Sequence, residues 1–307
     1  MKQLLLLFFC SLLITRAYAD CSSDGISVWP LTKTIPASPV FIVGGYAMSQ
    51  ELITGLSNSH KAYLKSGKTL IELKVVRVLT GEMYLTQAIL KPITALVPGL
   101  SYSLYIEGMN EYDENISEFR TWKVVKDSDT RVPEWQSDPT YSSKSYTAFG
   151  CGPAKYVNFC ACVSDRSPVA ILTKIRERKT GKISEYYLIP DSSGIEIGHG
   201  MCAGAFRFLD GEEYEAQFSL MDASGNSDGK FTDAIDFVSP TEEDQSLNEK
   251  KEAECGCVAT AKDEEGSLYI IIGITFLTLL GAFVLVFAVR RRTVALQRKK
   301  RLNNPAL

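Results

Sequence analysis

Cysteine is the residue type whose number and spacing in this chain point most directly to chemistry. Six of the eight cysteines lie between residues 151 and 257, namely Cys151, Cys160, Cys162, Cys202, Cys255 and Cys257. Disulfides persist in exported proteins, and both ends of this chain indicate export. We therefore expect two bridges among the first four, with Cys151 joined to Cys160 or Cys162 and Cys202 joined to the other.

A zinc site is the alternative use of these thiols. Cys160, Cys162 and Cys202, together with His199, would supply four ligands. Structural zinc sites usually carry two ligand pairs at Cys-x-x-Cys spacing, which this sequence lacks. We therefore expect no metal and no cofactor.

Recognisable catalytic motifs are missing from the sequence. His60 and His199 are its two histidines, and neither stands in a serine, cysteine or carboxylate arrangement typical of a hydrolase. We expect both on the surface or in loops. Neither Gly44-Gly45 nor Gly198-His199-Gly200 is followed by the Gly-Lys-Ser/Thr of a phosphate loop. The sequence therefore predicts a protein that is not an enzyme.

The region after residue 223 has the alternating oxygen side chains with which a calcium loop begins. Ser224, Asn226 and Asp228 are followed by Gly229. Ile235 stands where the closing bidentate glutamate would have to be. We expect a plain β-turn.

The N-terminus has the layout of a cleavable export signal. Lys2 precedes an apolar run over residues 4–15, which is too short to span a bilayer. The sequence Ala17-Tyr18-Ala19 places small residues where a signal peptidase reads them. We expect a signal peptide over residues 1–19. The alternative is a lipoprotein signal with Cys21 acylated, but the acidic residue before it matches that motif poorly.

An uncharged apolar run near the C-terminus predicts a transmembrane helix. Residues 268–289 contain no charged side chain, and roughly 20 such residues cross a hydrocarbon core of about 30 Å. Acidic residues precede the run and an arginine cluster follows it, so the C-terminus should be cytoplasmic. We expect a single-pass helix over residues 267–289, a basic tail over residues 290–307, and an N-terminal part at the cell surface or in the periplasm.

The part predicted to be exported is acidic. Nine of the 33 basic residues lie outside residues 20–266, which leaves 24 basic against 36 acidic residues and a net charge of −12. Such a surface repels nucleic acid, whose phosphates need basic patches. Residues 239–266 are rich in charge and nearly free of aromatic side chains, so we expect an acidic stalk there.

Between the two ends, the sequence shows the pattern of short strands. Apolar residues alternate with polar ones over residues 71–75 and again over residues 169–175, a period of two that is typical of strands with one buried face. The run Lys179-Thr180-Gly181-Lys182 predicts a hairpin turn. Only residues 48–65 suit a helical turn. The fold class expected is therefore all-β.

A polar run that ends in Pro133 divides the strand-rich region into two parts of similar length. Linkers between domains have this composition, and each part has the length of an immunoglobulin-like sandwich. We expect two tandem β-sandwiches, domain 1 over residues 20–127 and domain 2 over residues 128–238, with the disulfides in the second.

A tyrosine recurs at matching places in the two domains. Tyr102 follows Leu96-Val97-Pro98-Gly99, Tyr214 follows Leu209-Asp210-Gly211, and each begins an alternating strand. In β-sandwiches such a tyrosine corner buries the ring while the hydroxyl binds the backbone of the preceding turn.

Both stretches resemble the Leu-x-Pro-Gly-x-x-Tyr signature of fibronectin type III domains. The run Asp222-Ala223-Ser224-Gly225-Asn226-Ser227 resembles the Asp-x-x-Gly-Asn-x-Ser ending of bacterial Ig-like modules. The resemblance implies two fibronectin type III-like or Ig-like modules that bind or space rather than catalyse.

The run Cys255-Gly256-Cys257, placed before an apolar helix and an arginine cluster, resembles the cysteine-helix-arginine sorting tails of some bacterial surface proteins. That resemblance implies processing or anchoring near these cysteines, so that the helix would be a temporary anchor. An intermolecular or vicinal disulfide in the stalk is the alternative.

The sequence thus predicts a non-enzymatic, membrane-anchored protein that binds a protein or glycan ligand, or serves in adhesion or as a scaffold. Exposed sheet edges and the loops at the ends of the sandwiches are the expected contact surface. A structural spacer is the alternative, and an exported hydrolase or metal-binding protein is a weaker one.

Overall fold

The computed structural model describes residues 25–56, 58–109, 120–126, 129–190 and 194–247, together with Cys255. The predicted signal peptide, transmembrane helix and basic tail lie outside these residues, and so does Cys257. Within the described ranges, no helix is long and apolar enough to cross a membrane. Strands dominate these ranges, which confirms the all-β class.

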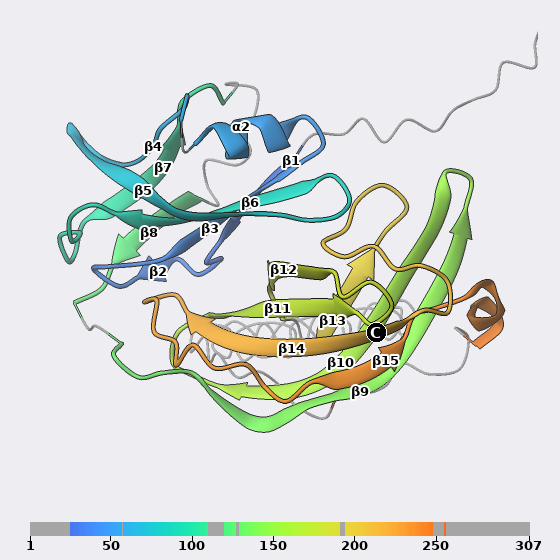
Figure 1. Ribbon diagram of the computed structural model, residues 1–307. Coiled ribbons are helices and arrows are strands. Elements are labelled where there is room, and N and C mark those ends of the chain that lie inside the picture. Colours follow the sequence, from blue (N-terminus) through green and yellow to red (C-terminus); the bar gives the residue numbers. More distant parts are fainter. Residues whose placement is uncertain are drawn as a thin grey trace, which may run out of the picture. The chain divides into compact units, whose positions relative to one another are not determined.

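Domain 1 is built from one continuous sheet with the strand order β1-β3-β6-β5-β4-β7-β8-β2 (Figure 1). Helix α2 begins within the stretch where the sequence suited a helical turn. The elements in chain order are β1 (Gly25–Trp29), β2 (Thr34–Ile35), β3 (Phe41–Tyr46), α2 (Ser49–Gly55), β4 (Ala62–Ser66), β5 (Thr69–Thr80), β6 (Leu85–Pro92), β7 (Ser101–Ile106) and β8 (Thr121–Val124).

Strand β5 joins the two halves of this sheet. Its first residues pair with β4, its later residues pair with β6, and the register shifts between Val75 and Arg77. A bulge of this kind bends a strand. The rings of Phe41 on β3 and Trp122 on β8 meet with their centroids 4.9 Å apart, although the two strands lie far apart in the order of the sheet. The two halves therefore enclose one core, as in a sandwich.

Domain 2 has two separate sheets, with the orders β13-β10-β9 and β12-β11-β14-β15. Counted within the domain, the strands follow the orders five-two-one and four-three-six-seven, which is a Greek-key arrangement of the kind found in immunoglobulin-like sandwiches. The strands are β9 (Glu134–Phe149), β10 (Gly152–Ser164), β11 (Val169–Glu177), β12 (Ile183–Leu188), β13 (Ile195–His199), β14 (Glu213–Asp222) and β15 (Ile235–Val238).

Strand β11 shows why these residues form a half-buried strand. Ile171, Thr173 and Ile175 are buried, whereas Lys174 between them is only partly covered. The predicted hairpin then joins β11 to β12. Its turn holds Gly181 at a φ of +72°, a backbone conformation that residues with a Cβ rarely adopt.

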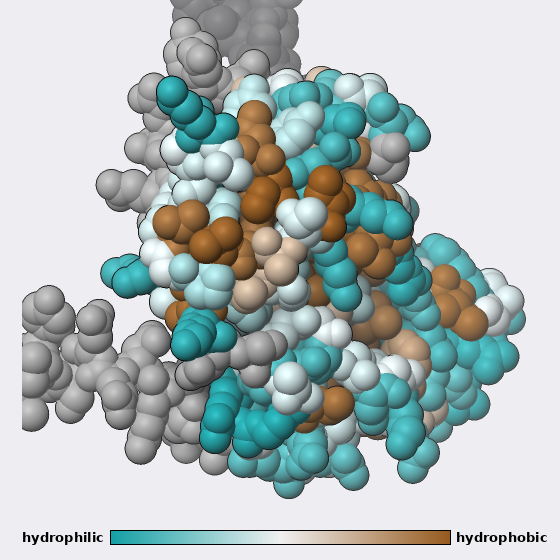
Figure 2. All heavy atoms as spheres, turned by 90° about the vertical axis from the view of Figure 1, so that its left-hand side faces the viewer, coloured by the Kyte–Doolittle hydropathy of each residue, from teal (hydrophilic) through white to brown (hydrophobic). Residues whose placement is uncertain are grey.

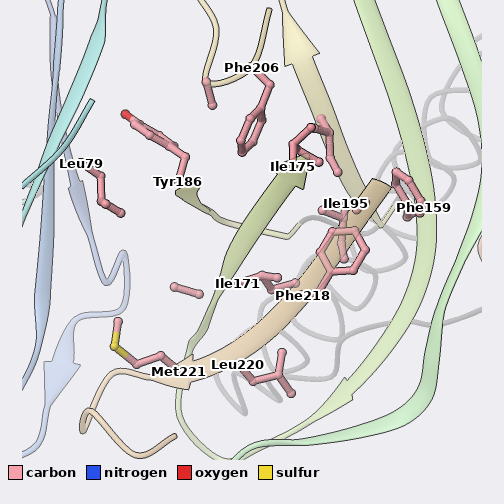
Figure 3. Close-up of a cluster of buried hydrophobic side chains, with 14 of the residues drawn as sticks. Leu79, Phe159, Ile171, Ile175, Tyr186, Ile195, Phe206, Phe218, Leu220 and Met221 are labelled. Atoms are coloured by element: carbon pink, nitrogen blue, oxygen red, sulfur yellow. The ribbon is translucent and has the colours of Figure 1, made fainter. Parts of the chain in front are cut away.

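Aromatic rings fill the space between the two sheets of domain 2. Phe159 on β10 lies 5.2 Å from Phe218 on β14 and 5.7 Å from Phe237 on β15, measured between ring centroids. Figure 3 shows Phe159 and Phe218 side by side in this core. Edge-to-face contacts of this kind add to the stabilisation from burial.

The two tyrosines predicted to form corners both bind the turn before their strand. Tyr102 accepts a hydrogen bond from the backbone N–H of Val97 at 3.3 Å, and Tyr214 accepts one from Leu209 at 3.0 Å. Both side chains are buried. Each hydroxyl therefore satisfies a backbone donor at the start of a central strand.

The fold continues past Val238, where the sequence predicted a stalk to begin. Ser239 is fully buried, and its backbone N–H donates to Glu212 at 3.0 Å. The 3-10 helix η3 (Glu242–Leu247) follows, and Asp244 forms an ion pair of 2.9 Å with Lys144 on β9. The first residues of the expected stalk are therefore part of domain 2.

The tyrosine corner of domain 2 predicts how much stability is lost when the hydroxyl of Tyr214 is removed. Tyr214→Phe leaves the backbone N–H of Leu209 without its acceptor, so we expect a loss of about 1–2 kcal/mol in the free energy of unfolding. Urea denaturation of the full chain measures it. Tyr105→Phe is the control, because the side chain of Tyr105 is half exposed. Equal losses in the two variants would contradict the role given to the corner.

Candidate functional site

The two domains meet where the β5–β6 turn of domain 1 enters a loop of domain 2. The backbone N–H of Glu82 donates to Ala205 at 3.0 Å, and Met83 exchanges two backbone hydrogen bonds with Gly204, at 3.1 and 2.9 Å. These bonds extend β-type pairing from one domain to the other. Backbone groups of the two domains therefore pair in a defined register at this contact.

The side chain of Glu82 is the polar centre of this junction. Its carboxylate accepts hydrogen bonds from Ser184 at 2.6 Å and from the backbone N–H of Arg207 at 2.7 Å, and it pairs with Lys182 at 2.5 Å. Burial alone would raise the pKa of Glu82, but the bonds from Lys182, Ser184 and Arg207 hold it below its ordinary value. Glu82 is therefore a charged structural link that is poorly suited to act as a general base.

A second polar link lies further along β6. Gln87 is only 3% exposed; its amide nitrogen donates to the carbonyl of Tyr187 at 3.2 Å, and its oxygen accepts from the N–H of Tyr187 at 2.7 Å. The amide thus takes the place of a neighbouring strand for β12. Arg77 and Glu185 form an ion pair beside it.

Apolar side chains complete the junction. Trp29, Val40, Ile42, Leu79 and Ile89 of domain 1 belong to the same buried cluster as the core of domain 2. In Figure 3, Leu79 lies on the side of domain 1 and Tyr186 of β12 lies between it and the rest of the cluster. These five residues of domain 1 therefore pack into the core of domain 2, while domain 1 keeps a second core of its own.

Gly225 is needed where the end of β14 approaches domain 1. A Cβ at this position would lie 2.7 Å from a methyl carbon of Val40, and the backbone has a φ of +80°. Beside it, the N–H of Val40 donates to the carbonyl of Ala223 at 2.8 Å. The motif that resembled an Ig-like ending thus forms part of the contact between domains.

A cavity of about 340 Å³ opens beside Glu82. Ile175, Phe208 and Tyr214 supply apolar surface, while Glu177 and Arg207 are among its charged residues. No histidine or cysteine lines it. Among the residues that line it, no histidine or cysteine is therefore available as a base or nucleophile.

His199 was expected on the surface or in a loop, but it is buried on β13 and only 4% exposed. Its Nδ1 lies 3.0 Å from the carbonyl of Gly200, and its buried Nε2 has no hydrogen-bond partner among the described residues. Burial and the nearby charges of Lys155 and Arg207 lower the pKa of His199. The fold therefore holds this imidazole in its neutral form.

Three aspartates from separate segments converge near the linker. Oxygens of Asp129, Asp165 and Asp222 all lie within 4.8 Å of one another, a donor set of the kind that hard cations prefer. Hydrogen bonds from Ser167 and Asn226 already hold Asp129 and Asp222. Burial and the neighbouring carboxylates raise the pKa of Asp165, so it accepts a proton more readily than an ordinary aspartate. We assign no ion to this cluster.

The disulfide partner of Cys160 differs from the expected one. Cys160 on β10 is joined to Cys255, not to Cys151 or Cys202. The chain after β15 returns along β9, which brings Cys255 to β10. Cys162 and Cys202 are disulfide-bonded as well, and Cys151 lies exposed at the turn between β9 and β10.

Comparison with known proteins does not show which family this chain belongs to. No family model matches it, and no curated protein matches it significantly. Similar solved structures include the FN1–FN3 domains of chicken CNTN1, with 10% identity and a TM-score of 0.25, over 70% of this chain and 64% of that one. A two-domain fibronectin type III segment of chicken tenascin is 9% identical, with a TM-score of 0.21, over 71% of this chain and 98% of that one.

A pullulanase from Anoxybacillus sp. LM18-11, complexed with maltotriose, is also similar, with 10% identity and a TM-score of 0.22. The match covers 61% of this chain but only 23% of the pullulanase. TM-scores this low carry no argument about ligand or activity. The strand orders given above, and not these likenesses, establish the sandwich architecture.

The link at Glu82 predicts a measurable loss of stability. Glu82→Gln replaces one acceptor oxygen by an amide that faces donors, so we expect a loss of about 2–3 kcal/mol in the free energy of unfolding. Thermal unfolding of the full chain measures it. The control is Glu72→Gln, since Glu72 pairs with Lys61 in an exposed ion pair of the kind worth about 0–1 kcal/mol. A variant at Glu82 as stable as the control would show that the link is dispensable.

The buried histidine predicts a dependence of stability on pH. The unfolded chain takes up a proton at His199 near pH 6.5, while the folded chain resists it because its pKa is lower. Stability should therefore fall as the pH drops below about 6.5. His199→Asn should flatten the curve of melting temperature against pH between 7.5 and 5.5. His60→Asn is the control, and an unchanged curve in the variant at His199 would contradict the assignment.

Proposed function

We propose that this chain is a single-pass membrane protein that holds two β-sandwiches outside the cytoplasm as a non-enzymatic binding or scaffold module. The observation that carries the proposal is the junction, in which polar links and a buried cluster with residues from both domains hold the two sandwiches together. Domains fixed in this way present the loops of both as a single surface. Such preorganisation lowers the entropic cost of binding a partner.

The anchor rests on the sequence. An uncharged run of helix length with acidic residues before it and an arginine cluster after it supports a permanent helix over residues 267–289. The apolar run at the N-terminus supports export. The sequence left a processed sorting tail, or an intermolecular or vicinal disulfide, as alternatives for Cys255 and Cys257. Cys255 is joined to Cys160, so the intermolecular or vicinal disulfide is wrong for Cys255.

Loops at the end of domain 1 are the contact surface that we favour. Ile93, Val97 and Leu100 lie in the connection between β6 and β7, where 59%, 54% and 44% of each residue is exposed. Figure 2 shows apolar side chains gathered on the upper half of the face it presents. Apolar residues that stay exposed together often mark an interaction site.

A structural spacer is the second candidate function. The same rigid junction would let the chain hold another domain or protein at a set distance, without any contact through the loops. The two functions differ in whether a partner depends on the side chains of the β6–β7 connection.

The proposed transmembrane helix predicts that the chain resists extraction from the membrane. The full chain should stay in the pellet after alkaline carbonate treatment, whereas a chain without residues 267–289 should move to the supernatant. A green fluorescent protein fused after Leu307 should fluoresce, because the C-terminus is expected in the cytoplasm. Extraction of the intact chain by carbonate, or a dark fusion, would contradict the proposed anchor and orientation.

Partner capture separates the binding module from the spacer. Cross-linking on intact cells with the full chain, followed by the same experiment with Ile93→Ser and Val97→Ser together, compares what each recovers. We expect a partner that the double variant loses by about tenfold or more, the effect of roughly 1.4 kcal/mol at the contact. A control change at Lys230, an exposed residue of domain 2, should retain the partner. Equal recovery by all three chains would favour the spacer.

A further inference from the structure

A hollow of about 500 Å³ lies on domain 1, where helix α2 and the turn after it face the adjoining ends of β5 and β6. Its volume is within the range of pockets that hold small ligands. All of the described residues that line it are polar or glycine, and they include Gln50, Thr54, Asn58, Ser59, Thr80 and Thr86. Segments about 30 residues apart in sequence thus supply one polar surface.

Close packing of the helix on the sheet holds the walls of this hollow in place. A Cβ at Gly45 of β3 would lie 2.5 Å from the carbonyl oxygen of Ser49 and 2.6 Å from the side chain of Ile53. Glycine therefore lets the helix come closer to the strand than a residue with a side chain would allow. Ile53 is fully buried in the core of domain 1, and Thr80 pairs with Thr86 across β5 and β6.

The amide of Gln50 is fixed inside the hollow by two hydrogen bonds. Its Nε2 donates to the carbonyl of Ala47 at 3.0 Å, and its Oε1 accepts from the hydroxyl of the buried Thr86 at 3.3 Å. The N–H of Ala47 in turn donates to the carbonyl of Tyr84 at 3.1 Å, and both residues have a φ of +50°. Non-glycine residues rarely adopt this conformation, and those that do cluster where ligands bind.

The lining excludes several classes of ligand. No lysine, arginine or histidine lines the hollow, so a phosphate or another anion would find no cation there. Glu51 is the one carboxylate in the lining, whereas sites for hard cations usually supply several. No aliphatic or aromatic side chain lines it either, so a lipid or an apolar peptide would leave the polar groups unpaired.

We propose that this hollow binds a neutral carbohydrate. Hydroxyl and amide groups both donate and accept hydrogen bonds, as the hydroxyls of a sugar do. The methyl groups of Thr54, Thr80 and Thr86 offer contacts for the C–H groups of a sugar ring. The side chains of Asn58 and Thr80 are exposed and form no hydrogen bond within the described residues, so they are ready to bind the ligand.

This site is separate from the contact surface proposed above. Thr86 stands near the start of β6, whereas Ile93 follows the end of that strand. At about 3.3 Å per residue, the two lie roughly 20 Å apart. The carbohydrate site therefore stands or falls independently of the β6–β7 connection and of the membrane anchor.

NMR of the full chain with ¹³C-labelled threonine methyl groups tests the proposal. The chain is kept in a detergent without a sugar headgroup, and the probes are neutral trisaccharides of glucose, mannose, galactose and N-acetylglucosamine. We expect at least one of them to shift the signals of Thr54, Thr80 and Thr86 with a Kd in the millimolar range. The signal of Thr69, at the opposite end of β5 from Thr80, should stay in place.

A double variant tests which side chains bind the sugar. Asn58→Ala with Thr80→Ala removes two exposed side chains, and we expect the affinity to fall about tenfold as two hydrogen bonds are lost. The matched control is Thr69→Ala with Ser101→Ala, which changes two exposed residues of domain 1 outside the hollow and should keep the affinity of the wild type.

Three results would overturn the proposal. The first is that none of the neutral trisaccharides moves the three threonine signals of the wild type, a result that does not depend on how the variants fold. The second is equal affinity in the folded double variant and the control. The third is tighter binding of a sulfated sugar than of its neutral parent, which would make the hollow an anion site.

Discussion

The carboxylate of Glu82 is the interaction on which the arrangement of this molecule depends. It belongs to the turn between two strands of domain 1, yet its donors, Lys182, Ser184 and the backbone of Arg207, all belong to domain 2. A partly buried carboxylate without donors would be costly, because burial disfavours its charge. Domain 1 therefore supplies the carboxylate, and domain 2 supplies the hydrogen-bond donors that stabilise its charge.

The shared core explains why the junction is more than a polar contact. Residues of β1, β3, β5 and β6 enter the same cluster as the rings of domain 2, so separation would expose apolar surface as well as break hydrogen bonds. Contacts between domains that resemble transient interfaces allow relative motion, whereas a continuous core restrains it. The buried cluster that both domains enter therefore restrains their relative motion.

Local patterns in the sequence predicted the local structure well. Alternation over residues 169–175, the hairpin at Gly181 and the all-β class follow from the period of the side chains and from turn chemistry, both of which act over a few residues. The division into domains at residues 127 and 128 stays a prediction, and the structure adds that β9 begins directly after Pro133.

The junction between the domains and the Cys160–Cys255 disulfide could not be predicted from local sequence patterns. Glu82 and Gln87 look like ordinary polar residues of a turn and a strand, and only the fold brings them within reach of residues about 100 positions later. Cys255 seemed to belong to a stalk because its neighbours are charged, but Asp244 and Ser239 find partners on domain 2. The composition of a segment indicates how much apolar surface it can bury by itself. It does not indicate which contacts the segment makes with a neighbouring domain.

The relative motion of the two sandwiches tests this account most directly. Spin labels introduced as non-canonical amino acids at Lys68 of domain 1 and Lys230 of domain 2, both exposed, report one distance across the junction by double electron–electron resonance. The account predicts a single narrow distance distribution in the full chain. A broad distribution, spread as widely as two domains on a free linker would give, would contradict it.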